Sequence, residues 1–484
     1  MMPENLAECY PAEEAKNKVS KQLSNLERDP EPSSLNSTRE DTTMNLNDMI
    51  IISVDDHIIE PADMFDQHIP ASLKDKAPKL LTKEDGSNVW IFEDMEIINV
   101  GLNAVVGRPR SEYGMEPTAY DQLRKGTFDV HERVNDMNAN GLLASLNFGT
   151  FVNFDGSLFL KAKDKKLAIE VIKAYNDWHI DEWCGAYPGR FIPLAILPCW
   201  DVDATVTEIE RVVKKGCHAI SFSDNPNAKG LPSIHNEYWE PMWKVCNDNQ
   251  VVVNCHIGTG YAPPHPSMES PIDAWITGMP MSISNSAADW IQLEAFHRYP
   301  DLKMALSEGG IGWIPYFLER ADFTHEHHHE WTHTDFRGKK PSDIFREHII
   351  TCFIDDKFGV ANAEAVGVDT ICYECDYPHS DTVWPKTPEY LMAGFEEAGN
   401  PDEVINKMTH ENAMRHYNFD PLSILGRENC TVGALREKAT DVDVTPKSQG
   451  GARPLEEGVE RRVTSGDVVK LFAANSGLAK LPES

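Results

Sequence analysis

Ile51-Ile52-Ser53-Val54-Asp55-Asp56-His57 is an apolar run with the residue types of a β-strand, and it closes on an acid, a spacer and a histidine. Because successive side chains of a strand point to opposite faces, Asp55 and His57 are expected to point the same way. Together they can hold one metal ion at the C-terminal end of the strand. A parallel barrel gathers its chemistry from the C-terminal ends of several strands, so further ligands are expected at later strand ends. His256, Glu308 and Asp376 lie at the C-terminal ends of later expected strands.

Eight short β-type runs recur along the chain, with helical patterns between most of them. The runs lie at Met49–Val54, Leu142–Phe148, Arg190–Leu197, His218–Phe222, Val251–His256, Leu302–Ser307, Ile350–Ile354 and Thr370–Cys375. The helical patterns lie at Lys163–Trp183, Val202–Lys215, Asn236–Asn249, Ala287–Tyr299, Ile314–Glu330 and Pro388–Ala398. This alternation predicts a single α/β domain, a (β/α)8 TIM barrel. A doubly wound open sheet is the alternative, because periodicity alone does not count closure.

Three segments fall outside the repeat. Residues 1–45 are rich in polar residues and are expected to form a disordered leader before a barrel of residues 46–425. Residues 58–141 are too many for an ordinary connection, so we expect an insertion in which Asn88–Ile98 forms a small hairpin and acts as a lid. Residues 426–484 are expected to form an irregular arm, which either wraps a partner subunit or is disordered.

Composition narrows the classes of partner. Asp and Glu number 77 against 45 Lys and Arg, which gives a formal net charge of -32 and opposes binding to nucleic acid or an anionic membrane. No apolar run reaches the roughly 18–20 residues needed to span a bilayer, and the N-terminus has no apolar signal segment. We therefore expect a cytoplasmic enzyme with a small-molecule substrate, assembled as a homo-oligomer or with a related subunit.

Each candidate ligand also has a purely structural interpretation. The loop Gly258-Thr259-Gly260 after His256 leaves space above that strand, although it lacks the dinucleotide fingerprint and a following helix start. A lone histidine in an apolar context is more often a satisfied core residue, and Asp376 before Tyr377-Pro378 could cap a turn. The coincidence of such residues at four strand ends favours a site.

At these motifs the chain resembles the amidohydrolase-related branch of the metal-dependent hydrolase superfamily, which includes the aminocarboxymuconate-semialdehyde and γ-resorcylate decarboxylases. The resemblance runs from about residue 50 to 420. It rests on Ser53–His57, Cys255–Gly258, Ser307–Pro315, Asp376–Pro378 and Asn412-Ala413. It implies a divalent metal ion (Zn, Mn or Fe) held by the residues that match the family's ligands. These are Asp55, His57, His256 and Asp376.

Two departures from the family pattern bear on the reaction. The first motif is Asp55-x-His57 in place of His-x-His, which adds negative charge and oxygen character to the site. The related decarboxylases have a histidine as general acid/base where this chain has Glu308. A carboxylate exchanges protons with substrate only if its pKa rises towards the working pH, and it can also bind a metal directly. Glu308 and Asp376 are therefore the candidate catalytic residues.

Direct metal binding by Glu308 raises the possibility of a second ion. The candidate ligands or supporting residues for it are Glu60, Glu308, His328 and His379. His328 belongs to the cluster His325-Glu326-His327-His328-His329, whose alternative is an exposed helix face. Asp381, with Trp313 after the sixth strand, is expected to line the substrate pocket.

Four functions remain open at this stage. Hydrolysis by metal-activated water ranks first, with Asp376 or Glu308 taking the proton as hydroxide attacks a carbonyl or amide carbon. Nonoxidative decarboxylation ranks second, and oxygenation at a dinuclear non-haem site ranks third. A noncatalytic partner subunit with a structural metal is the alternative from another class. Fold and metal ligands are shared among these functions, so the sequence separates them poorly.

Overall fold

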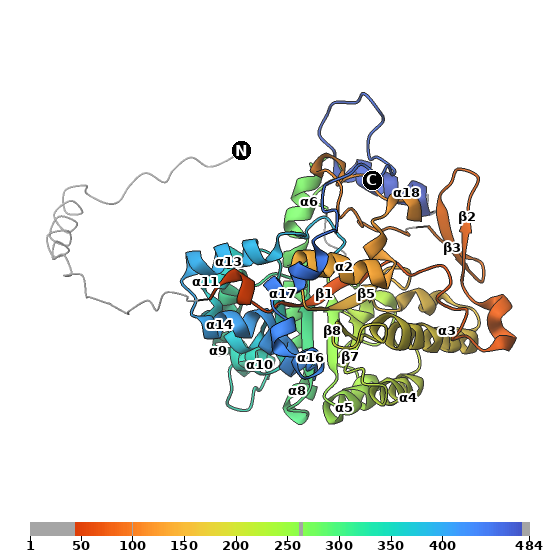
Figure 1. The fold of residues 1–484 in the computed structure, drawn as a ribbon. Coiled ribbons are helices and arrows are strands. Elements are labelled where there is room, and N and C mark those ends of the chain that lie inside the picture. Colours follow the sequence, from red (N-terminus) through yellow and green to blue (C-terminus); the bar gives the residue numbers. More distant parts are fainter. Residues whose placement is uncertain (1–43, 99, 261–264, 477–484) are drawn as a thin grey trace, which may run out of the picture. The chain divides into compact units, whose positions relative to one another are not determined.

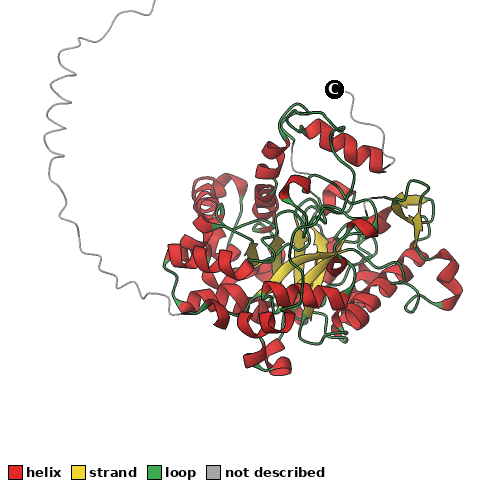
Figure 2. Cartoon of the chain, turned by 45° about the horizontal axis from the view of Figure 1, so that its top comes forward, coloured by secondary structure: helices red, strands yellow, loops and turns green. Residues whose placement is uncertain are grey.

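The computed structural model describes residues 44–98, 100–260 and 265–476, with side chains up to residue 472. The segment expected to be a leader therefore lies almost entirely outside the described residues. Figure 2 shows a central group of strands enclosed by helices. This arrangement is the α/β barrel expected from the alternating pattern.

Eight parallel strands form the central sheet, in the order β6-β5-β1-β11-β10-β9-β8-β7. Beyond β6, Ala195 closes the barrel on β7: its amide donates to the carbonyl of Ala219 (3.0 Å) and its carbonyl accepts from the amide of Ser221 (2.8 Å). The barrel is thus closed, and the open-sheet alternative does not apply. The strands are β1 Ile52–Ile58, β5 Ala144–Gly149, β6 Phe191–Ile192, β7 Ala219–Ser223, β8 Val252–His256, β9 Lys303–Ser307, β10 Ile349–Phe353 and β11 Ile371–Tyr373.

Helices cover the outside of the barrel (Figure 1). Several begin at an aspartate that accepts hydrogen bonds from the first free amides, as Asp129 does from His131 and Glu132 before α2. The helices are α2 Val130–Asn140, α3 Lys165–Asp177, α4 Val202–Val213, α5 Glu240–Asp248, α6 Ile272–Gly278, α7 Ile283–Trp290, α8 Glu294–Arg298, α9 Ile314–Thr332, α10 Pro341–His348, α11 Lys357–Ala361, α12 Ala363–Val366, α13 Thr387–Ala398, α14 Asp402–Asn406, α15 Asn412–His416, α16 Pro421–Leu425, α17 Val432–Arg436 and α18 Ser465–Ser476.

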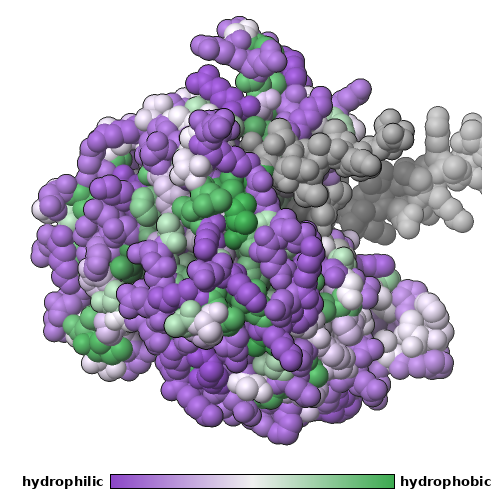
Figure 3. All heavy atoms as spheres, turned by 90° about the vertical axis from the view of Figure 1, so that its right-hand side faces the viewer, coloured by the Kyte–Doolittle hydropathy of each residue, from purple (hydrophilic) through white to green (hydrophobic). Residues whose placement is uncertain are grey.

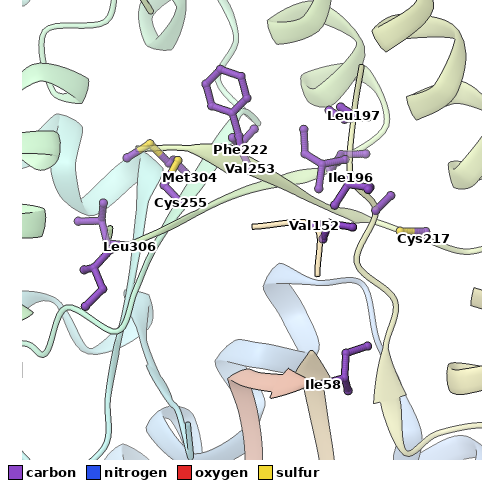
Figure 4. Packing of buried hydrophobic residues seen from close by; sticks show 14 of the residues in the cluster. Ile58, Val152, Ile196, Leu197, Cys217, Phe222, Val253, Cys255, Met304 and Leu306 are labelled. Atoms are coloured by element: carbon purple, nitrogen blue, oxygen red, sulfur yellow. The ribbon is translucent and has the colours of Figure 1, made fainter. Parts of the chain in front are cut away.

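The core has two layers that follow the alternation of the strands. One cluster fills the barrel interior and includes Ile52, Val54 and Phe148. The other lies between the strands and the helices, where Figure 4 shows Phe222, Val253, Cys255, Met304 and Leu306 among its members. Burial on both faces explains why these strands are continuously apolar in the sequence.

The first strand differs from its expected bounds in a way that matters for the site. It runs from Ile52 to Ile58, so the acidic motif lies within the strand and not after it. Its pairing with β5 shifts register between Ser53 and Asp56. Strict alternation from Val54 would turn Asp56 inwards, whereas Asp56 faces Arg133 of α2. A bulge of this kind changes the direction in which the following side chains point. Here His57, the expected ligand, points into the barrel in place of Asp56.

The insertion after β1 contains the expected hairpin. Strands β3 Asn88–Phe92 and β4 Met95–Ile97 pair with each other, and β2 Lys79–Thr82 adds a third antiparallel strand. Trp90 and Phe92 are each 1 % exposed and belong to the core cluster between barrel and helices. Their rings lie 4.9 and 5.6 Å from those of Phe151 and Phe159 respectively. The hairpin is therefore anchored on the barrel, and its role as a lid stays a prediction.

Replacing Trp90 with alanine is expected to lower the free energy of unfolding by about 3–5 kcal/mol, because a buried aromatic ring is lost and a cavity remains. Chemical denaturation measures this change. Leu81→Ala is the matched control, since Leu81 lies on the neighbouring strand and is 51 % exposed. A loss at Trp90 no larger than the control's roughly 0.5 kcal/mol would mean that the hairpin does not contribute to the core.

The chain after the barrel is irregular between residues 440 and 464 and then forms α18, which contacts α6 (Figure 1). An antiparallel bridge between Pro271 and Thr464 joins the two segments. The face of the molecule drawn in Figure 3 is mostly hydrophilic, with separate apolar patches, as the excess of charged residues leads one to expect. Among the helices of the described residues, none is both long enough and apolar enough to cross a membrane.

Candidate metal centre

Four strand ends at one rim of the barrel converge on a buried polar cluster. Asp55 and His57 come from β1, and His256 is the last residue of β8. Glu308 directly follows β9, and Asp376 follows β11 after two further residues. Both adopt left-handed backbone conformations, with φ of 60° and 53°. Such conformations are costly for residues other than glycine and are typically retained at functional sites.

The ligand atoms of the four predicted metal-binding residues lie close together. His57 Nε2 is 3.5 Å from Asp55 Oδ1 and 3.4 Å from Asp376 Oδ1. His256 Nε2 is 3.2 Å from His57 Nε2. All four side chains are buried. The spacing is that of atoms able to share one ion, and Asp55, His57 and His256 form one such group.

A second, overlapping group shares His57 and consists of His57, Glu308, Asp376 and His379. Glu308 Oε2 lies 2.9 Å from His256 Nε2, and His379 Nδ1 lies 2.8 Å from Asp376 Oδ1. The rings of His57 and His379 stack with centroids 3.9 Å apart. The predicted candidates Glu308 and His379 are thus adjacent to the four residues above, and the cluster offers enough donors for one or two ions.

The chemistry of these side chains fits a divalent cation. Both carboxylate oxygens of Asp55 are buried without a hydrogen-bond partner, and the carboxylate of Asp376 faces the imidazoles of His57 and His379. Burial raises the pKa of both carboxyl groups well above its usual range. Burial acts to lower the pKa of His256, yet the facing carboxylates of Asp55 and Glu308 raise it to about 9. In their ionised form, carboxylates buried in this way require a positive charge beside them. Nitrogen and oxygen donors suit Zn, Mn or Fe.

The tautomer of His256 is set for metal binding. Its Nδ1 lies 2.7 Å from the carbonyl oxygen of Ile257, to which it can donate. Nε2 is then the free nitrogen, and it faces His57, Asp55 and Glu308. Histidine ligands commonly have their second nitrogen fixed in this way.

Glu374 is part of the site and was not predicted. Its Oε2 accepts from the backbone amide of Glu308 (2.9 Å) and from the thiol of Cys352 (2.6 Å). Burial raises its pKa to about 7. It lies two positions before Asp376 and inside the expected strand run Thr370–Cys375, so strand alternation was a signal that could have found it. The carboxylate holds the backbone of Glu308 in place from inside the barrel.

The other predicted residues are more scattered. Glu60 Oε2 accepts from the amide of Phe151 (2.8 Å) and belongs to neither ligand group. His328 lies on α9, where its Nδ1 accepts from the indole of Trp331 (3.1 Å) on the outside of the barrel. The indole of Trp313 donates to the carbonyl of Gly309 (2.9 Å). Burial raises the pKa of Asp381, and the charge of Glu308 raises it further.

A cavity of about 540 Å³ adjoins the cluster at Phe154. The Phe154 ring lies 4.6 Å from that of His57 and 4.5 Å from that of His256, and it also lines the cavity. Both Asn153 and Phe154 have positive φ, 60° and 62°, which places this ring over the histidines. Nothing in the sequence pattern indicated Phe154. The cavity is lined by Ile97, Leu102, Thr150, Asn153, Phe154, Ser157, Leu160, Lys161, Lys229 and Gly258.

Comparison with known families gives a match over most of the barrel. A family model described as Amidohydrolase matches residues 101–419. The match includes three of the predicted ligand positions, His256, Glu308 and Asp376, while Asp55 and His57 precede it.

Proteins of similar sequence or structure include decarboxylases and an amidohydrolase. A γ-resorcylate decarboxylase from Rhizobium radiobacter is 25% identical over 284 residues, which cover 55% of this chain and 82% of that protein. An amidohydrolase from Mycobacterium avium subsp. paratuberculosis has a TM-score of 0.58 at 18% identity, covering 76% of this chain and 99% of the other. A 5-carboxyvanillate decarboxylase from Novosphingobium aromaticivorans, solved with bound manganese, has a TM-score of 0.52 at 17% identity, covering 78% and 100%.

Proposed function

Because this chain belongs to the amidohydrolase family, we propose that it is a metal-dependent nonoxidative decarboxylase of a small organic acid. The observation that carries the proposal is the buried cluster of Asp55, His57, His256 and Asp376 at the rim of the barrel. The similarity to a γ-resorcylate decarboxylase supports decarboxylation over hydrolysis, which ranked first from the sequence. Hydrolysis and decarboxylation are both compatible with membership of the amidohydrolase family.

In this proposal the four residues hold a divalent ion, for which manganese is the first candidate because a related decarboxylase was solved with it. A bound ion supplies a Lewis acid that orients the substrate and stabilises negative charge developing on it. His256 keeps its Nε2 available because Nδ1 faces the carbonyl of Ile257. Phe154 and the surrounding barrel exclude water from the histidines, which strengthens electrostatic interactions there.

Decarboxylation breaks the bond between carbon and carboxylate, and a proton must replace the departing CO2. We assign proton delivery to Glu308, which is buried at the rim and held in place by Glu374. Asp381 is the neighbouring carboxylate, and the charge of Glu308 helps to raise its pKa. Burial acts to raise the pKa of Glu308, but the facing His256 lowers it below its usual value, so the neighbouring Asp381, whose pKa is raised, is the group from which Glu308 can take up a proton.

A second candidate function is favoured by one specific observation, the two overlapping ligand groups that share His57. If Glu308 and His379 bind a second ion, the centre is suited to two-metal chemistry, such as hydrolysis or oxygen activation. Metal content distinguishes the two proposals, because the first requires one ion per chain and the second requires two.

The test is a survey of aromatic and unsaturated carboxylic acids for release of CO2 by the purified, metal-replete protein. We expect stoichiometric CO2 and a product that lacks one carboxyl group. Chelation should abolish release, and addition of Mn²⁺ or Zn²⁺ should restore it. Cleavage of an ester or amide without CO2, or consumption of O2 with two ions bound, would replace the decarboxylase proposal by one of the alternatives.

A further inference from the structure

The cavity beside Phe154 is cationic in an otherwise acidic chain. Its wall contains Lys161 and Lys229, and no Asp or Glu is among the described residues that line it. The whole chain has 77 acidic residues against 45 Lys and Arg. A cavity wall with two lysines and no acidic residue therefore differs from the composition of the chain as a whole. A cavity lined by charge of one sign attracts ligands of the opposite sign.

The two lysines differ in whether their charge is already balanced. Lys229 Nζ lies 2.7 Å from Asp155 Oδ2 and 2.7 Å from Ser157 Oγ. Lys161 ends the short 3-10 helix Ser157–Lys161 and is exposed to the cavity. Within the part of the chain that the structure describes, no carboxylate lies within ion-pair distance of Lys161. Its charge is therefore available to a ligand.

The rest of the wall is suited to an apolar body. Ile97, Leu102 and Leu160 line it together with the Phe154 ring. A volume of about 540 Å³ falls within the roughly 300–1,000 Å³ usual for pockets that bind drug-sized molecules. Phe154 borders both this cavity and the histidines, so the inner end of the cavity lies beside the metal centre. An elongated molecule that displaces this ring can lie along the cavity and reach the centre with one end.

We propose that Lys161 forms a distal anion subsite, and that the substrate is an elongated organic acid with an apolar body and two anionic groups. One end, a carboxylate, reacts at the metal centre, and a second anionic group at the other end pairs with Lys161. The identity of the reacting end rests on the proposed decarboxylase function. The distal subsite rests on the cavity alone.

Calorimetric titration of the metal-replete protein tests this subsite. The probes are biphenyl dicarboxylate, with its acids at the two para positions, and para-phenylbenzoate, which lacks the distal acid. The diacid is expected to bind about tenfold more tightly, as one charge-assisted contact implies. Lys161→Met should remove this difference, whereas Lys161→Arg should retain it.

Lys163→Met is the matched control, because Lys163 is a nearby exposed lysine that pairs with Asp94 and does not line the cavity. It should leave the preference for the diacid unchanged. Equal affinity for the two probes, no saturable binding of the diacid, or no effect of Lys161→Met would each overturn the subsite. A diacid carrying phosphonate in place of the distal carboxylate shows which anion the subsite prefers.

The two proposals fail separately. If the preference depends on Lys161 but no organic acid releases CO2, the subsite stands and the decarboxylase function falls. If CO2 is released while Lys161→Met leaves every affinity unchanged, the decarboxylase function stands and the subsite falls.

Discussion

His256→Ala is expected to abolish most activity and to lower metal affinity by at least about a hundredfold. Loss of a side chain that only orients a metal ligand typically lowers metal affinity by up to about a hundredfold. His256 presents its own nitrogen to the cluster, so its loss is expected to have at least that effect. The substitution also leaves Asp55 and Glu308 without the histidine that now faces them. Metal content by mass spectrometry and turnover on the same sample measure both effects.

The control for this variant is His348→Ala. His348 is also buried, and its Nδ1 lies 2.8 Å from the carbonyl oxygen of Leu302, away from the rim. It should keep full metal content even if it lowers stability. A His256→Ala protein that is folded, fully loaded with metal and active would remove His256 from the centre.

Glu308→Gln is expected to lower turnover by roughly a hundredfold or more while leaving one bound ion in place, because positioned acid/base groups typically contribute that much. Glutamine keeps the size of the side chain and cannot transfer a proton. If Glu308 instead binds a second ion, the same substitution should remove about one metal equivalent per chain. Measuring turnover and metal content together separates these two roles.

Glu60→Gln serves as the comparison for Glu308→Gln. Glu60 is a buried glutamate that follows β1, yet it accepts from the amide of Phe151 and belongs to neither ligand group. It should keep both metal content and turnover per folded molecule. Unchanged turnover and unchanged metal in Glu308→Gln would mean that the carboxylate only caps the turn at Gly309-Gly310.

The barrel could be predicted because its signal is repeated. Eight apolar runs separated by helical patterns leave few other architectures, and burial on both faces makes each run apolar throughout. Details that depend on neighbouring strands could not be predicted. The third barrel strand, β6, is only Phe191–Ile192, followed by a single bridge at Ala195. The helix expected at Ala287–Tyr299 is divided into Ile283–Trp290 and Glu294–Arg298.

The location of the metal cluster could be predicted from the sequence only in part. Asp55 and His57 do face one site, but they do so after a register shift that no residue pattern in β1 reveals. Phe154 reaches the histidines through two consecutive left-handed residues, a backbone choice that the types Asn153 and Phe154 do not dictate. Strand alternation pointed only weakly to Glu374, which binds the backbone amide of Glu308. The cluster around His328 has the residue types of a metal site, but it lies on the outside of the barrel.

The most direct test of the central claim is anomalous X-ray scattering from crystals of the metal-replete protein, collected on both sides of the metal's absorption edge. We expect a peak about 2.0–2.2 Å from Nε2 of His57 and of His256 and from a carboxylate oxygen of Asp55 and of Asp376. A second peak bounded by Glu308 and His379 would establish a two-metal centre. A fully loaded protein whose only anomalous peak lies elsewhere, such as at the histidines of α9, would contradict the assignment of this cluster as the metal centre.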